Sequence, residues 1–226
     1  MKVGVDRRAV VAALAPMLTM VPLTPRATAF PNGIAADADK ISPGPTPADI
    51  GLKAEGALRP CLDGKPHCFS SSLKVGSQLA NTKQIGTDWV VAPWTYTGMG
   101  VAGAMADIKK VINSYEVGQA GIDAGGFRVA KLSPPETVDD AGYIYCQFEA
   151  AAGYLDDVEF GVYDGVVNVR TSSRLGYLDF GVNAKRHNYF AKKLGALKGW
   201  KTSTIAAKDH PNYFAQNELT NKDVGL

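Results

Sequence analysis

The chain has 226 residues, of which 46% are hydrophobic and 20% are charged, and its formal net charge is +2. A chain of this length and composition can bury a sizeable core, so we expect one globular domain with accessory segments. No apolar run reaches the length that spans a bilayer, which predicts a mature protein that is soluble or peripheral to a membrane.

The first 29 residues have the pattern of a twin-arginine export signal. Arg7 and Arg8 precede an apolar stretch at 9–23, and small residues at 27 and 29 form a cleavage site. An N-terminal core helix is the alternative, but three prolines would break its interior: Pro16, Pro22 and Pro25. We therefore predict that the mature chain begins after Ala29.

Export changes the charge balance of the chain. Cleavage after Ala29 removes four basic residues and Asp6, which leaves 20 basic and 21 acidic residues and a net charge of about −1. Nucleic-acid-binding proteins carry clustered basic charge, so we expect no nucleic acid among the partners.

The start of the mature chain bears on the compartment. Residues 30–54, FPNGIAADADKISPGPTPADIGLKA, are similar to algal lumenal proteins of the photosynthetic apparatus. We therefore expect the thylakoid lumen, with a bacterial periplasm as the alternative. A nuclear-encoded lumenal precursor carries a plastid transit segment upstream of its signal, whereas only residues 1–6 precede the two arginines. The sequence is then either truncated or of bacterial or plastid origin.

Residues 30–60 are rich in proline, glycine, alanine and aspartate, and we predict an extended arm there. Proline prevents regular structure at five positions: Pro31, Pro43, Pro45, Pro47 and Pro60. A disordered linker is the alternative interpretation, because few large apolar residues are available to dock the segment.

Two cysteines follow the arm, seven residues apart, with a glycine and a proline between them. In an exported protein the default is a disulfide between Cys61 and Cys68. A metal site that includes the neighbouring His67 is the alternative, although the sequence offers no second well-spaced pair of ligands. The third cysteine, Cys146, alternates with apolar residues, so we predict that it is buried and free.

The elements that follow are predicted from apolar spacing. Residues 100–115 and 182–197 have the spacing of helices. Period-two alternation predicts four successive strands at 127–132, 143–151, 158–162 and 166–171, with the turn dipeptide Asp164-Gly165 before the last. The segment 89–97 is strand-like but contains Pro93, which suits an edge strand or a connection.

These elements predict an α+β fold. Short connections make the four strands an antiparallel meander, and we expect a sheet of about four to five strands packed with two helices. In the second helix, we expect the core-facing side chains to be Val182, either Tyr189 or Phe190, and Leu194. Four basic side chains should face water: Lys185, Arg186, Lys192 and Lys193. The domain spans 61–200, and a polar tail at 201–226 with isolated aromatics is either disordered or wraps around a partner.

Three motifs carry a resemblance to a known family. DDVEF at 156–160, NVRTSSRLGYLDFGVN at 168–183 and CLDGKPHCFSSS at 61–72 resemble the signature of domain-of-unknown-function family 1499. The resemblance covers about residues 59–200, and it departs from the usual pattern at Thr171 and Cys146. Because the family has no assigned activity, the resemblance implies a fold and not a reaction.

Charged and small polar residues concentrate where the last hairpin meets the second helix. In one interpretation, the arginines pair with the acids and brace this junction. In a second, two arginines and two serines form an anion pocket at the helix N-terminus, and in a third, paired carboxylates act as acid and base or hold a cation. Asp179 or Asn183 would cap the helix. The full set is Asp156, Asp157, Glu159, Arg170, Ser172, Ser173, Arg174, Asp179 and Asn183.

The sequence carries little that indicates nucleophilic catalysis. We expect the three histidines at the surface, and no nucleophile elbow, phosphate loop or dinucleotide fingerprint is present: the histidines are His67, His187 and His210. We therefore predict a non-catalytic accessory subunit without a cofactor, associated with a membrane protein complex such as a photosystem. The alternative is a small-ligand or anion-binding protein, or a hydrolase-like enzyme, that uses Asp156, Arg170, Arg174 and Asp179.

Overall fold

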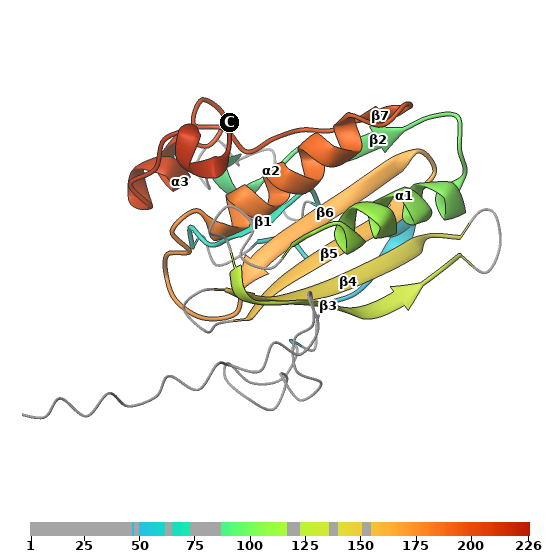
Figure 1. Cartoon of the computed structure of the whole chain (residues 1–226), viewed down its shortest axis with the longest axis horizontal. Helices are drawn as coiled ribbons and strands as arrows, with labels where there is room; N and C mark the ends of the chain where they lie inside the picture. Colours follow the sequence, from blue (N-terminus) through green and yellow to red (C-terminus); the bar gives the residue numbers. More distant parts are fainter. Residues whose placement is uncertain are drawn as a thin grey trace, which may run out of the picture.

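The computed structural model describes residues 47, 50–61, 65–72, 87–116, 123–135, 140–150 and 155–226. The predicted export signal at 1–29 and most of the predicted arm at 30–60 lie outside these residues. Within them, an antiparallel sheet and helices form the α+β architecture that the apolar spacing predicts (Figure 1).

The described residues form a seven-stranded sheet in the order β3-β4-β5-β6-β2-β7, and β1 pairs with β6. The predicted meander is confirmed by its four long strands. The sheet is wider than expected because the other three strands are two or three residues long, too short to show alternation. The bounds are β1 Cys68–Ser70, β2 Trp94–Tyr96, β3 Asp123–Ser133, β4 Gly142–Ala150, β5 Leu155–Tyr163, β6 Val166–Ser173 and β7 Trp200–Lys201.

Local sequence sets two details of the sheet. Asp164 and Gly165 both have positive φ, 37° and 75°, as the tight turn of a two-residue hairpin requires. Pro93 lies in the connection directly before β2, which agrees with one of the two predicted alternatives, and β2 itself lies between β6 and β7 and not at an edge. The proline is tolerated there because it precedes the first paired residue of β2, so its missing N–H group costs the sheet no hydrogen bond.

Two helices cover one face of the sheet. Figure 1 shows α1 (Val101–Asn113) and α2 (Val182–Gly195) side by side on that face. The main core lies beneath them, and its fully buried members include Trp94, Ala104, Ile112, Cys146, Phe148, Phe160, Phe190 and Leu194. Among the described residues, no helix is both long and apolar enough to cross a membrane.

The opposite face of the sheet is covered by the segment 50–58, which contains the short helix η1 (Ala54–Gly56). Its backbone approaches β5 so closely that a Cβ on Gly161 would lie 2.1 Å from the Gly56 carbonyl oxygen. Glycine at 161 is therefore required by this contact. Leu58 packs there with Tyr143 and Tyr145 in a small second cluster.

The C-terminal residues differ from the expected polar tail. They form α3 (Pro211–Gln216) and η5 (Lys222–Val224), and they bury Tyr213 and Phe214. The Tyr213 ring lies 4.6 Å from that of Phe69 in β1, between centroids, and 6.4 Å from that of Trp89 in η3 (Thr87–Trp89). Periodicity does not reveal this packing, because the apolar partners come from a segment far earlier in the chain.

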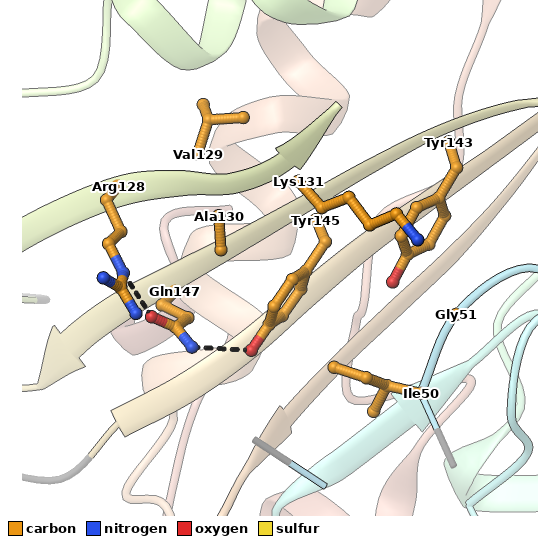
Figure 2. A pocket seen from close by; sticks show the side chains of 9 residues that line it. All are labelled: Ile50, Gly51, Arg128, Val129, Ala130, Lys131, Tyr143, Tyr145 and Gln147. Carbon is orange, nitrogen blue, oxygen red and sulfur yellow. Dashed lines mark hydrogen bonds between the residues drawn. The ribbon is translucent and has the colours of Figure 1, made fainter. Parts of the chain in front are cut away.

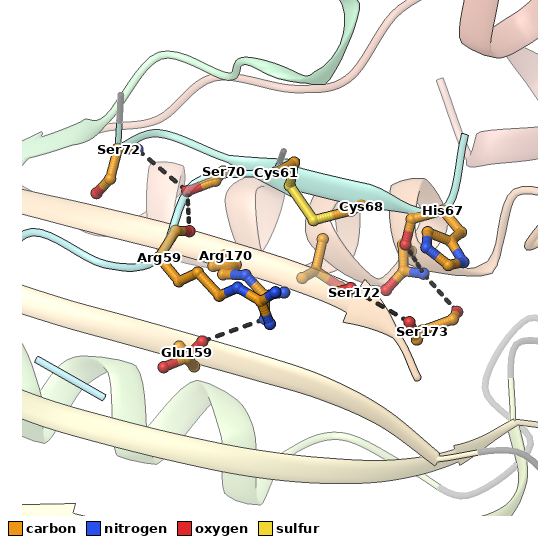
Figure 3. Close-up of a disulfide and its surroundings, with 12 residues drawn as sticks. Arg59, Cys61, His67, Cys68, Ser70, Ser72, Glu159, Arg170, Ser172 and Ser173 are labelled. Carbon is orange, nitrogen blue, oxygen red and sulfur yellow. Dashed lines mark hydrogen bonds and ion pairs between the residues drawn. A yellow bond between two sulfur atoms is a disulfide. The ribbon is translucent and has the colours of Figure 1, made fainter. Parts of the chain in front are cut away.

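The predicted disulfide joins Cys61 to Cys68 (Figure 3). Cys68 begins β1 and lies opposite Ser172 of β6, so the bond ties the end of the covering segment to the sheet. Cys146 is free and buried, as its alternation with apolar residues predicts, and burial raises the pKa of its thiol.

Removal of the disulfide should weaken the fold without abolishing it. Closing a loop this small restricts the unfolded chain, so Cys61→Ser/Cys68→Ser should lower the free energy of unfolding by about 2 to 3 kcal/mol. Urea denaturation measures the change. Reductant should have the same effect on the wild type and none on the variant, and equal stability of the two proteins would contradict the expectation.

Candidate functional site

The predicted site residues do not converge on one pocket, because β5 divides its acids between the two faces of the sheet. Successive side chains of a strand point to opposite faces. Asp156 lies opposite Ser173 and faces the helices, whereas Asp157 lies opposite Ser172 and faces away from them. Glu159 follows Asp157 on that second face, opposite Arg170. All three acids are almost completely buried.

On the face away from the helices, Asp157 pairs with Arg174. The guanidinium donates from Nε to Asp157 Oδ2 at 2.9 Å and from Nη2 to Asp157 Oδ1 at 2.8 Å. Nη2 also donates to the Tyr145 hydroxyl, which itself donates to Asp157 at 2.6 Å. Burial alone would lower the pKa of Arg174, but these bonds to Asp157 outweigh it and raise the pKa. The arginine is therefore permanently charged and fully engaged by the acid.

Glu159 has three partners on the same face. Arg170 forms an ion pair with Glu159 (Figure 3), in which Arg170 Nη1 lies 3.2 Å from Glu159 Oε2 and both side chains are buried. The Tyr143 hydroxyl donates to Glu159 Oε1 at 2.7 Å, and the Gly51 amide donates to the same oxygen at 2.8 Å. Burial and then the charge of Glu159 raise the pKa of Tyr143, so this phenol stays protonated. The carboxylate thereby links three strands to the covering segment.

On the helix face, Asp156 pairs with Arg186 of α2. Nη1 of the arginine lies 3.0 Å from Asp156 Oδ2, and its guanidinium stacks 4.5 Å from the centroid of the Phe148 ring. Burial raises the pKa of Asp156, and the arginine offsets part of that rise. We expected Arg186 to face water, and that expectation is wrong. Arg186 lies on the buried side of α2 with Phe190, which follows one turn later. Its partner there is the buried carboxylate of Asp156 and not an apolar side chain.

Asp179 holds the start of α2. Its carboxylate accepts the amides of Gly181 and Asn183 at 3.1 and 3.0 Å. The N-cap residue of α2 is Gly181, so neither predicted residue occupies the cap position, but Asp179 binds free amides of the first turn from two residues before it. The Tyr213 hydroxyl donates to the same carboxylate at 2.9 Å. Burial raises the pKa of Asp179 despite these bonds. Asp179 thus fastens the C-terminal segment to the helix.

Asn183 joins three elements instead of capping the helix. Its amide donates to Ser173 Oγ at 2.9 Å and to the His67 carbonyl at 3.1 Å, and its carbonyl accepts the Thr171 hydroxyl. Asn183, Ser173 and Thr171 are all buried. The amide therefore crosslinks α2, β6 and the loop before β1.

The arrangement agrees with bracing more than with ligand binding at these residues. Arg170 and Arg174 are occupied by carboxylates, and Ser172 and Ser173 point to opposite faces, so the four do not surround one anion. In the part of the chain that the structure describes, no three acids, cysteines or histidines are grouped to hold a metal ion.

The three histidines are buried, which contradicts the surface positions that we expected. His187 donates from Nε2 to the Ser203 carbonyl at 3.0 Å and packs 5.1 Å from the Trp94 ring, between centroids. His210 donates from Nδ1 to the Asp88 carbonyl at 2.8 Å. Burial lowers the pKa of His187 to about 4, so this histidine is neutral in the folded protein.

Sequence reasoning missed Arg186 and the two tyrosines of β4. Arg186 precedes Phe190 and Leu194 at helical spacing, so its position on the apolar stripe was a usable signal. Tyr143 and Tyr145 alternate with core residues and so face the same side as Glu159 and Asp157. The predicted meander places the strand at 143–151 beside the strand at 158–162, but alternation does not fix the register that brings each tyrosine to its acid.

A cavity of about 500 Å³ opens beside the tyrosines, over β3 and β4 (Figure 2). In Figure 2, Arg128, Lys131 and Gln147 point into it with the two phenols, and Ile50 of the covering segment lies across from them. The remaining lining residues are Gly51, Val129 and Ala130. None of the predicted site residues lines it.

Comparison with known proteins gives one result. Residues 57–194, which are more than half of the chain, match the family described as protein of unknown function (DUF1499). No curated protein and no solved structure matches the chain significantly.

The burial of His187 predicts a loss of stability in mild acid. Below pH 6.5 the unfolded chain protonates this histidine, whereas the folded protein does so only near pH 4. The free energy of unfolding should therefore fall by up to about 3 kcal/mol between these values. Urea denaturation from pH 7 to 4 measures the fall, and His187→Gln should flatten it.

The comparison with His187→Gln isolates the histidine. Asp156 and Asp179 have raised pKa values, so they act in the opposite direction, gaining stability as the pH falls through those values in both proteins. An unchanged pH profile in the variant would contradict the assignment.

Proposed function

The chain belongs to the DUF1499 family, and we propose that it is a non-catalytic accessory protein that binds a partner protein through the loop at 174–181. The observation that carries the proposal is an exposed aromatic side chain on a strained backbone. Phe180 is 71% exposed and has a φ of 52°. Left-handed backbone is unfavourable for a residue with a Cβ, and an exposed ring gains nothing from the fold in return.

Phe180 has apolar neighbours in the same loop. Tyr177 is 59% exposed and Leu175 is 42% exposed, and together these three are half of the large exposed apolar side chains among the described residues. Clustered exposed apolar residues mark interaction sites more often than scattered ones do. Aromatic residues are also the type that contributes most to binding at protein interfaces.

Buried polar contacts hold the loop in this conformation. The Asp179 carboxylate accepts the backbone amides of Gly181 and Asn183, and the Phe180 amide donates to Asn217 Oδ1 at 2.9 Å. At the other end, Arg174 is fixed on Asp157. A strained residue persists only where its surroundings determine it, and here they keep the ring in solvent.

Three observations support an exported location for this protein. The twin-arginine pattern and the lumen-like N-terminus favour the thylakoid lumen, with a bacterial periplasm as the alternative. The disulfide agrees with either oxidising compartment. The proposed partner is a membrane protein complex such as a photosystem, to which the protein binds peripherally.

A small-ligand or anion-binding protein, or a hydrolase-like enzyme, is the second candidate. The raised pKa values of Asp156 and Asp179 favour it, because catalytic carboxylates are often perturbed in this way. However, Arg170 and Arg174 are occupied by acids. The accessory role therefore has more support.

Phe180→Gly separates binding from stability. Glycine relieves the positive φ, so the free energy of unfolding should stay the same or rise by up to about 1 kcal/mol. Association with the source membrane complex, quantified by native gel and mass spectrometry, should weaken at least about tenfold.

Leu132→Gly is the matched control, because Leu132 is 43% exposed on the edge strand β3, away from the loop. It should leave association unchanged. A Phe180→Gly protein that associates as tightly as the wild type would contradict the proposal, as would a wild type that never associates with any complex.

A further inference from the structure

A bulge in β3 brings two basic side chains onto one face of the sheet. Residues three apart in a regular strand point to opposite faces. Here Arg128 lies opposite Gln147 and Lys131 lies opposite Tyr145, and the register shifts between Val129 and Lys131. Gln147 and Tyr145 are two apart and share a face, so the extra residue in β3 turns Lys131 to the side of Arg128. Bulges frequently re-aim side chains near functional sites.

The cavity that these side chains enter has a basic lining. Among its described lining residues, two are basic and none is acidic. Gln147 Oε1 accepts Nε of Arg128, which orients the guanidinium, and Lys131 Nζ lies 5.9 Å from the centroid of the Tyr143 ring. The ion pairs found among the described residues do not include Lys131. Its ammonium is therefore available to a ligand.

The acids beneath the cavity do not cancel this charge. Asp157 and Glu159 lie under the tyrosines, but each is already paired with a buried arginine. The layer below the cavity is therefore balanced, and it does not neutralise the ammonium of Lys131 at the cavity wall. A site of this kind binds anions.

The phenols add a second feature. The Tyr143 hydroxyl donates its hydrogen bond to Glu159, so its oxygen can accept a hydrogen bond from a ligand. The Tyr145 hydroxyl already accepts hydrogen bonds from Arg174 and Gln147 and donates one to Asp157. These bonds fix the position of its ring in the cavity wall. A ligand hydroxyl can therefore be recognised beside the anionic group.

We propose that this cavity binds a small hydroxylated oxyanion, a phosphate ester or a hydroxycarboxylate, with its anionic group between Arg128 and Lys131 and a hydroxyl on Tyr143. A volume of about 500 Å³ accommodates a molecule of this size. The site shares no residue with the 174–181 loop, so it goes beyond the accessory role and is tested separately from it.

Backbone NMR of the full mature chain tests the site with defined probes. Glucose 6-phosphate represents phosphate esters, citrate represents hydroxycarboxylates, and glucose is the neutral control. At least one anion should shift the amide signals of Gly51, Arg128, Lys131 and Gln147 in a saturable way, while glucose should not. The anion that binds more tightly assigns the group.

Two lysine variants decide the outcome. Lys131→Gln should weaken binding of that anion about tenfold, which corresponds to the loss of one charged contact. Lys201→Gln is the matched control, because Lys201 is an exposed strand lysine at the other edge of the sheet. It should bind like the wild type. Failure of both anions to shift the cavity signals at about 10 mM, or equal effects of the two substitutions, would overturn the proposal.

Discussion

The fold depends on three carboxylates of one strand that are removed from water. Asp156, Asp157 and Glu159 are buried in β5, at the centre of the meander, and an unpaired charge there would cost more than most single contacts return. Each acid instead meets an arginine from a different element: α2, the loop after β6, or β6 itself. Because the strand alternates, one pair fastens the helix layer and two fasten the opposite face. The acids thus connect both layers through a single strand.

The exposed features of the protein rest on this arrangement. Arg174 is held by Asp157 at the point where the 174–181 loop leaves the sheet, and Asp179 holds the other end of the same loop on α2. Phe180 is therefore presented to solvent by a rigid frame. Tyr145, whose hydroxyl donates to Asp157 of the same ion pair, lines the cavity over β3 and β4. The interior charges have their partners within the fold, which leaves the surface residues to carry interactions with other molecules.

The sequence predicts the long strands and helices, but it does not predict which distant side chains contact one another. Alternation predicted β3 to β6 and helical spacing predicted α1 and α2, because those patterns are local. Bracing of the junction by pairs of arginines and acids is one of three interpretations that the sequence allows, and the ion pairs of Arg170 and Arg174 agree with it. A basic residue on a helix usually lies in water, so the sequence predicts the wrong environment for Arg186, whose acid comes from a distant strand. The packing of Tyr213 is not predictable for the same reason, since its partners Phe69 and Trp89 lie far from it in the chain. The bulge that joins Arg128 to Lys131 has no signature apart from the pairing of two strands.

A double-mutant cycle on Asp156 and Arg186 tests most directly whether the buried acids depend on their arginines. Arg186→Met leaves Asp156 buried and unpaired, so urea denaturation at pH 7 should show a loss of about 3 to 5 kcal/mol. Asp156→Asn/Arg186→Met removes both charges and should recover most of that loss, giving a coupling energy of at least about 2 kcal/mol. Lys185→Met, one residue away on α2, should cost less than about 0.5 kcal/mol. Additive effects of the two substitutions, with Arg186→Met costing no more than Lys185→Met, would contradict the account.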